Sequence, residues 1–255
     1  MTSIKEIYKY LCDLAPLELQ MSFDNSGFQI GRLNKEVSKV LLSLDVTDDV
    51  VKEAEAIGAK LIISHHPLIF RGVKSIDGAY PEGERLLNLV EKGIAVISMH
   101  TNLDIAAGGV NDVLIELLGA KAEAPLDSEN CGRIGHLNKA ICIEDFLKIC
   151  KEKLNANGLR YYSAGKRVFK LAVMGGAGGD NIEDAHVNGC DTYVTSDIKY
   201  HQFLMAQELG INLIDADHFC TENPVIPVLK NKLSEAFPRT EFIVSSVHKQ
   251  IVNFA

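Results

Sequence analysis

Residues 40–67, VLLSLDVTDDVVKEAEAIGAKLIISHHP, decide the fold class. Residues 40–44 form a short apolar run, which predicts a strand, and Thr47 then stands where it can cap a helix that ends at Gly58. Residues 61–64 predict a second strand. Because the apolar residues in these strands are continuous instead of alternating, we expect the strands to lie in a parallel sheet that is covered on both faces.

The same alternation of helices and strands continues on both sides of this stretch. A capping-box pattern predicts a helix over about residues 3–14, and residues 22–31, SFDNSGFQIG, are predicted to form a loop. Downstream, a helix at about 83–92 precedes a strand at 94–98, and another helix is expected over 109–118. Short apolar strands that alternate with helices indicate an α/β fold.

The chain also repeats itself. Residues 40–67 overlie residues 171–198 at an offset of 131, and residues 86–97 overlie residues 203–214 at an offset of 117. Both copies follow the order strand, helix, glycine, strand. We therefore predict two similar α/β lobes from an internal duplication. The alternative is that two generic strand–helix units resemble each other by chance.

The predicted first lobe comprises residues 1–124 and the second lobe residues 125–255. A helix near residues 144–155 is expected early in the second lobe. No low-complexity linker separates the two, so we expect them to pack tightly.

The composition excludes several classes of protein. The 255 residues include 26 basic and 34 acidic side chains, a formal net charge of −8, so we predict no direct nucleic-acid binding. No apolar run approaches the ~18 residues of a membrane span, and the N-terminus lacks the pattern of a signal peptide, so no membrane partner is expected. Six scattered cysteines without a CxxC pair are typical of reduced thiols in a cytoplasmic protein.

Polar side chains gather directly after the predicted strands, where ligands bind in open α/β sheets. They are His65 and His66 after one strand, His100 and Asp104 after the next, Ser196 and Asp197 in the second lobe, and Asp215, Asp217, His218 and Glu222 after the strand that follows. Because carboxyl ends of parallel strands lie at one edge of a sheet, these side chains are candidates for a common site.

Imidazole and carboxylate groups together suit Zn, Fe, Mn, Co or Ni. The spacing His100-x-x-x-Asp104 mirrors His218-x-x-x-Glu222 in the other half. These groups are more than one closed tetrahedral site uses and suit two adjacent metal ions with positions left for water. Two alternatives stay open at this point. A His-His pair after a strand can serve only to make turn hydrogen bonds, and acidic residues there can be solvated.

A glycine-rich stretch at residues 175–179, GGAGG, follows another predicted strand. It is either a strand-to-helix turn or a loop whose backbone N–H groups contact a phosphate. It lacks the acidic partner of a dinucleotide fingerprint and the Lys-Ser/Thr of a P-loop. No GxSxG elbow and no Cys–His nucleophile pattern is present in the sequence.

Five motifs together resemble the Ngg-interacting-factor-three family, whose bacterial members are named GTP cyclohydrolase I type 2 homologues. They are SFDNSGFQIG, LLSLDVTDDVVKEA, LIISHHPLIF, MHTNLDIAAGGVND and SDIKYHQFLMAQELGINLIDADHFCTE. The resemblance extends over nearly the whole chain. One departure is Phe23, where many members have Trp, which changes packing and leaves the polar residues intact.

The resemblance implies a two-lobed α/β subunit in a ring-shaped homohexamer with a dinuclear metal site facing the ring interior. The implied ligands to two divalent metal ions are His65, His66, Asp104, His218 and Glu222. By the family pattern, Glu222 bridges the ions, His66 and Asp104 complete one site, and His65 and His218 complete the other. His100 resembles a residue that transfers protons beside the metals.

The implied activity is hydrolytic opening of the guanine imidazole ring of GTP by a metal-bound water, with His100 as proton shuttle. Family members have also been proposed as metal carriers and as partners of transcription-related proteins. Two further classes therefore stay open: a metallochaperone or metal-storage protein, and a non-catalytic interaction protein. The sequence identifies neither the substrate-binding residues nor the native metal, because these ligands accept several ions.

Overall fold

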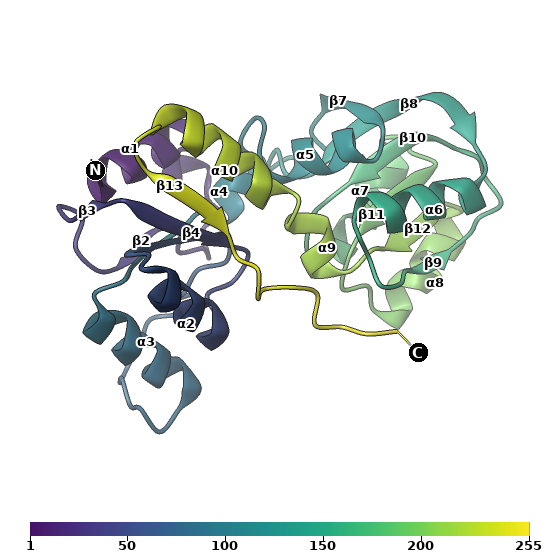
Figure 1. The fold of residues 1–255 in the computed structure, drawn as a ribbon. Coiled ribbons are helices and arrows are strands. Elements are labelled where there is room, and N and C mark those ends of the chain that lie inside the picture. Colours follow the sequence, from purple (N-terminus) through teal and green to yellow (C-terminus); the bar gives the residue numbers. More distant parts are fainter. Residues whose placement is uncertain (255) are drawn as a thin grey trace. The chain divides into compact units, whose positions relative to one another are not determined.

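The computed structural model describes residues 1–254 and divides the chain into two compact units (Figure 1). Unit 1 comprises Met1–Ala106 and Ile226–Lys249, and unit 2 comprises Ala107–Val225 and the segment from Gln250 onward. This division differs from the predicted lobes, because residues 226–249 return to add a helix and a strand to unit 1. Periodicity within each half carries no signal for such a return.

Unit 1 contains most of the predicted elements of the first half. Its elements are β1 (Thr2–Ser3), α1 (Ile4–Leu14), the 3-10 turn η1 (Leu17–Leu19), β2 (Gly27–Ile30), β3 (Glu36–Val37), β4 (Lys39–Ser43), α2 (Asp48–Ile57), β5 (Leu61–Ser64), α3 (Pro81–Lys92), β6 (Ala95–Ser98), α4 (Thr101–Ile105), α10 (Val225–Ala236) and β13 (Glu241–Val244). The main sheet has the order β13-β4-β5-β6-β2, in which only the pairing of β2 with β6 is antiparallel.

Local sequence signals explain the borders of these elements. The Thr47 hydroxyl accepts a hydrogen bond from the Val50 amide at the start of α2, and Gly58 ends that helix with φ 76°. The predicted loop at residues 22–31 is wrong in its second half, where β2 forms. Phe28 and Ile30 alternate with Gln29 there, which suits a half-covered edge strand on β6.

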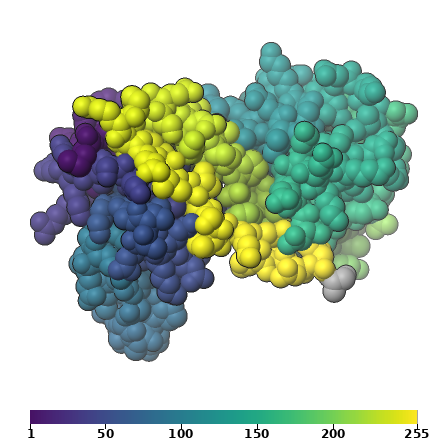
Figure 2. Space-filling view, in the orientation of Figure 1, coloured from purple at the N-terminus to yellow at the C-terminus, as the bar shows by residue number. Residues whose placement is uncertain are grey.

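The returning segment completes the core of unit 1. The Tyr10 ring contacts the Phe237 ring edge-on at a centroid distance of 5.4 Å, and the Thr240 hydroxyl donates to the Thr2 hydroxyl over 2.9 Å. Figure 2 shows this segment, in yellow, against the purple N-terminal residues. The first and last parts of unit 1 are therefore packed together although they lie far apart in sequence.

Unit 2 is built around a six-stranded mixed sheet. Its elements are α5 (Val110–Leu117), β7 (Ala120–Ala124), β8 (Arg133–Ile141), α6 (Ile143–Lys153), β9 (Arg160–Tyr162), β10 (Val168–Val173), the 3-10 turn η2 (Gly179–Asn181), α7 (Ile182–Val187), β11 (Thr192–Thr195), α8 (Tyr200–Leu209), β12 (Asn212–Asp215) and α9 (His218–Glu222). The strand order is β7-β8-β10-β11-β12-β9, with β10, β11 and β12 parallel. Phe146 and Cys150 of α6 pack among Leu171 and Val194 in its core.

The two units repeat one order of strands. In each, three parallel strands are followed by an antiparallel edge strand: β4-β5-β6-β2 in unit 1 and β10-β11-β12-β9 in unit 2. Adding 131 to the bounds of β5 gives those of β11, and adding 117 to the bounds of β6 and α4 gives those of β12 and α9. The offsets differ chiefly because sixteen residues, 65–80, connect β5 to α3, whereas four, 196–199, connect β11 to α8.

Among the residues described, no helix is both long and apolar enough to pass through a bilayer.

Candidate metal centre

The first two imidazoles of unit 1 follow β5 directly. His65 and His66 both donate their backbone N–H to the Leu44 carbonyl, over 3.1 and 2.9 Å, which bends the chain away from the strand direction. His65 is fully buried, and the His66 ring is about three-quarters buried with its side chain 22% exposed. The strand end therefore presents two adjacent histidine side chains, as the sequence predicted.

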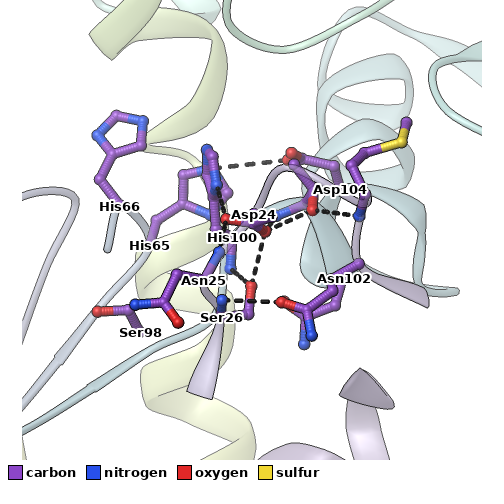
Figure 3. Close-up of polar contacts among 12 residues, drawn as sticks. Asp24, Asn25, Ser26, His65, His66, Ser98, His100, Asn102 and Asp104 are labelled. Atoms are coloured by element: carbon purple, nitrogen blue, oxygen red, sulfur yellow. Dashed lines mark hydrogen bonds and ion pairs between the residues drawn. The ribbon is translucent and has the colours of Figure 1, made fainter. Parts of the chain in front are cut away.

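The His65 ring has one defined tautomer. Its Nδ1 lies 2.8 Å from the Met99 carbonyl oxygen, which can only accept, so Nδ1 carries a proton and, in the neutral ring, Nε2 is the atom with the lone pair. That Nε2 atom lies 3.6 Å from Oδ1 of Asp104, which is buried on α4. A basic imidazole nitrogen and a carboxylate thus face each other at the carboxyl ends of β5 and β6, as Figure 3 shows.

The His66 ring is held by Asp45, the residue that follows Leu44. His66 Nδ1 lies 2.7 Å from Asp45 Oδ1, and His248 Nε2 lies 3.1 Å from Asp45 Oδ2. Burial acts to raise the pKa of Asp45, but the hydrogen bonds from His248 and His66 outweigh it and hold that pKa below its usual range. Asp45 is therefore a permanent carboxylate that orients both rings.

The His100 ring is held in the same way by Asp24. Its Nδ1 lies 2.7 Å from Asp24 Oδ1, while the other carboxylate oxygen accepts from the Thr101 amide over 3.0 Å and from the Ser26 hydroxyl over 2.9 Å (Figure 3). Burial acts to raise the pKa of Asp24, yet the hydrogen bonds from His100 and Thr101 keep it below the ordinary value. The buried carboxylate stays ionised and fixes the ring.

These three imidazoles form one cluster. The ring centroids of His65, His66 and His100 lie 5.0, 5.2 and 5.5 Å apart, and one nitrogen of each ring lies within 4.8 Å of the others. Neutral imidazoles whose Nδ1 positions are engaged by carboxylate or carbonyl oxygens are the usual donor set of transition-metal sites. The donor set of unit 1 therefore fits a divalent metal ion, and His100 lies inside the cluster instead of behind it.

Unit 2 contributes a second pair of candidate ligands on the short helix α9. His218 and Glu222 lie one turn apart on the same face, and His218 Nε2 is 3.1 Å from Glu222 Oε2. His218 Nδ1 is 2.7 Å from Asp197 Oδ2. Burial acts to lower the pKa of His218, but the Asp197 and Glu222 carboxylates outweigh it and raise that pKa to about 11.

The glycine-rich loop after β10 makes room for this pair. A Cβ atom on Gly176, which has φ 68°, would lie 2.1 Å from Glu222 Oε1 and 3.3 Å from His218 Cε1. The amide of Gly176 donates to the Thr221 hydroxyl over 3.0 Å, and the amide of Gly178 donates to the Thr195 hydroxyl over 2.9 Å. Because these N–H groups are used internally, the contacts support a close-packed turn and not a phosphate cradle.

Asp215, the last residue of β12, and Asp217 have structural partners, so they are not solvated turn residues. Asp217, with φ 70°, accepts from the Cys220 amide over 3.2 Å and caps α9. Asp215 is only 6% exposed, pairs with the Arg160 guanidinium and accepts from the Ile198 amide over 3.1 Å. The Asp215–Ile198 hydrogen bond fixes the chain directly after Asp197, which in turn orients His218.

The sequence interpretation underrated the acidic residues that hold the imidazoles. Asp197 is among the polar residues expected at a strand end, whereas no sequence pattern singles out Asp24 as the partner of His100 or Asp45 as the partner of His66. The available signal was their position directly after a predicted strand or inside a polar loop. His248 contacts Asp45, and His136 pairs with Glu123 over 2.9 Å.

Comparison with known proteins gives matches over nearly the whole chain. The family model described as Duf34/NIF3 (NGG1p interacting factor 3) matches residues 2–251. A Clostridium perfringens protein named GTP cyclohydrolase 1 type 2 homolog is 36% identical over 259 residues, covering 98% of this chain and 99% of that protein. A Helicobacter pylori protein named GTP cyclohydrolase 1 type 2 is 35% identical over 225 residues, covering 87% and 88%. The solved structure of a Bacillus cereus protein related to NIF3 gives a TM-score of 0.92 at 26% identity, covering 100% of this chain and 99% of that one.

Proposed function

Because the chain belongs to the Duf34/NIF3 (NGG1p interacting factor 3) family, we propose that it is a dinuclear metal-dependent hydrolase that opens the guanine imidazole ring of GTP. The observation that carries this proposal is the cluster of His65, His66 and His100, whose ring nitrogens lie within 4.8 Å of one another. The Nδ1 atoms of His65 and His66 each meet an oxygen acceptor, which is the arrangement that metal-ligating histidines need, and the His100 ring lies beside both.

We assign five ligands to two divalent ions, drawn from Zn, Fe, Mn, Co or Ni. The side chains that would hold them are His65, His66 and Asp104 of unit 1 and His218 and Glu222 of unit 2. Such ions supply Lewis acidity and make water a nucleophile near neutral pH. The space that Gly176 leaves for the Glu222 carboxylate supports a ligand role for that side chain, because no bulkier residue fits there.

His100 acts as the proton-transfer residue in this proposal. Water adds to C8 of the guanine ring and a C–N bond of the imidazole portion breaks, so a proton must pass from water to the departing nitrogen. With Asp24 ionised, His100 keeps its proton on Nδ1, and its Nε2 can accept and return the transferred one. Asp24 also stabilises the imidazolium that forms during this transfer.

To test the proposal, the protein is loaded with one metal at a time and incubated with GTP. Absorbance follows the loss of the purine band, and mass spectrometry looks for a product heavier than GTP by one water. Turnover that disappears in His65→Ala and persists in His136→Ala supports the assignment, because His136 is not among the assigned ligands and pairs with Glu123 within unit 2. Tight metal binding without turnover for any metal would instead identify a metal carrier. Function in the cell that survives Glu222→Ala would identify a non-catalytic interaction protein.

We also propose how this chain assembles, how its sequence arose and where in the cell it is located. The repeated order of strands, with matching bounds at offsets of 131 and 117, supports an internal duplication. The family resemblance supports a ring-forming homohexamer, which light scattering tests directly, since a stable monomer contradicts it. The six free cysteines support a reducing, cytoplasmic location.

A further inference from the structure

Two phenylalanine side chains beside the imidazole cluster are exposed to solvent. Phe23 is 65% exposed and Phe70 is 43% exposed, and their rings meet edge-on with centroids 6.4 Å apart. The Phe70 ring also meets the His100 ring edge-on at 6.0 Å. An exposed pair of large apolar rings in direct contact with a candidate catalytic group is a feature that commonly marks a binding surface.

Hydrogen bonds fix the two loops that carry these rings. The Asn25 side chain donates to the Ile69 carbonyl over 2.5 Å, and the Ile69 amide donates to the Gln29 side chain over 3.1 Å. Asp24, next to Phe23, is anchored by Ser26, Thr101 and His100. Both phenylalanines are thus adjacent to anchored residues. This favours a preformed surface over two mobile rings that are exposed only because no core position accommodates them.

Two basic residues follow Phe70 in the sequence. Arg71 follows Phe70 directly, and Lys74 lies three residues further along the same connection from β5 to α3. Both are exposed. In a chain with a net charge of −8, two exposed cations on the connection that carries Phe70 favour a ligand that combines a flat π-system with negative charge.

We propose that Phe23 and Phe70 form a stacking shelf that receives the planar heteroaromatic ring of an anionic nucleotide substrate and positions it against His100. This inference rests on the proposed function for the reaction, but the shelf is a binding site in its own right. The competing occupant is a second copy of the chain. The direct contact of Phe70 with His100 favours the substrate ring, because a subunit contact has no need to touch the reacting groups.

The absence of tryptophan from the sequence allows a direct measurement. Phe23→Trp and Phe70→Trp each introduce a sole tryptophan into the shelf, and a stacked purine quenches its fluorescence. The matched control is Phe169→Trp in unit 2. Phe169 is 42% exposed and its ring centroid lies 5.1 Å from that of His136, so it reproduces the exposure and the imidazole neighbour of Phe70 without belonging to the shelf.

With GTP as the probe, we expect saturable quenching in both shelf variants and none in Phe169→Trp. Inorganic tripolyphosphate should not quench, because it has no ring, but it should compete weakly through Arg71 and Lys74. Equal quenching in all three variants, or none in the two shelf variants, overturns the proposal. Light scattering of Phe23→Ala and Phe70→Ala tests the competing occupant, since a change of oligomeric state with unchanged GTP binding also overturns it.

Kinetics separate failure of the shelf from failure of the proposed function. If GTP is turned over, Phe70→Ala should raise KM by roughly tenfold with a smaller change in kcat, and Phe70→Tyr should restore KM whereas Phe70→Leu should not. Turnover with an unchanged KM in both alanine variants would contradict the stacking shelf but not the proposed hydrolase activity. Saturable quenching by GTP without turnover would support the stacking shelf and contradict the proposed hydrolase activity.

Discussion

The Cα hydrogen of Gly176 points toward the Glu222 carboxylate so closely that a methyl group in its place would lie 2.1 Å from Oε1. This contact links the glycine-rich turn after β10 to the candidate ligand on α9. It also means that one substitution far from Glu222 in sequence can displace its side chain.

Gly176→Ala should therefore weaken metal binding by unit 2 more than it destabilises the fold. The positive φ of 68° costs about 1 kcal/mol for alanine, and the clash with Glu222 adds displacement of the carboxylate. Gly165→Ala is the matched control, because Gly165 has φ 72° with nothing within 4 Å of the added Cβ. Metal titration by calorimetry and urea unfolding measure the two effects, and equal metal affinity in both variants would contradict the prediction.

Asp24→Asn should lower kcat by roughly 10- to 100-fold while the protein still folds, because the neutral amide can no longer fix the His100 tautomer or stabilise its imidazolium. The acidic limb of the kcat profile should also change, since that limb reports the protonation of the transfer group. Asp13→Asn removes an exposed ion pair with Lys9 and should leave both unchanged. A variant with wild-type kcat and pH profile would show that His100 needs no carboxylate.

Glu53 should make the metal-free protein sensitive to acid. Burial acts to raise its pKa, but hydrogen bonds from Ser245 and Ser246 outweigh it and hold the pKa below the ordinary value of 4.5. A depressed folded-state pKa gives stability that is present above the unfolded-state pKa and is lost as pH falls through the folded one. Urea unfolding over a pH series should show a flatter acid limb for Glu53→Gln than for the wild type.

The control for this experiment is Glu116→Gln on α5, which changes an exposed carboxylate of unit 2. Its acid limb should follow that of the wild type. Parallel curves for Glu53→Gln and the wild type would mean that the Ser245–Ser246 contacts contribute no net stability to the folded state.

The cysteines should differ strongly in reactivity toward iodoacetamide. Burial raises the pKa of Cys150 to about 12, that of Cys190 to about 11 and that of Cys220 to about 12, so their thiolate fractions are small at neutral pH. Cys142 is exposed at the start of α6. Peptide mass spectrometry should find Cys142 labelled first in the folded protein, and Cys150 only on unfolding. Prior labelling of Cys150 in native protein would contradict its burial.

Sequence patterns predicted the strands that carry the site better than the contacts that orient it. The strands at residues 61–64 and 94–98 were readable because buried parallel strands are continuously apolar, and β5 and β6 confirm them within a residue. The two His-x-x-x-acid patterns lie at the starts of α4 and α9, which follow equivalent strands, but one residue out of register: His100 precedes α4, whereas His218 is the first residue of α9. These features depend on local pattern alone.

The contacts that orient the imidazole rings depend on tertiary structure, so the local sequence pattern does not predict them. Asp24 meets His100 across 76 positions of sequence, and His248 reaches Asp45 only because β13 returns beside β4. The strand β2 was mistaken for loop because glycine and serine at its start resemble turn residues, whereas pairing with β6 decides its conformation. Long-range pairing outweighs local propensity at these places.

The unequal connections after β5 and β11 have an evolutionary and practical consequence. Residues 65–80 begin with two candidate ligands and then leave the sheet. The part of this connection that follows the ligands, residues 67–80, can therefore change length and chemistry without disturbing strand register in either unit. Natural variation of selectivity should concentrate there, and a chimera that exchanges only this segment between relatives should transfer ligand preference while leaving the metal-binding framework untouched.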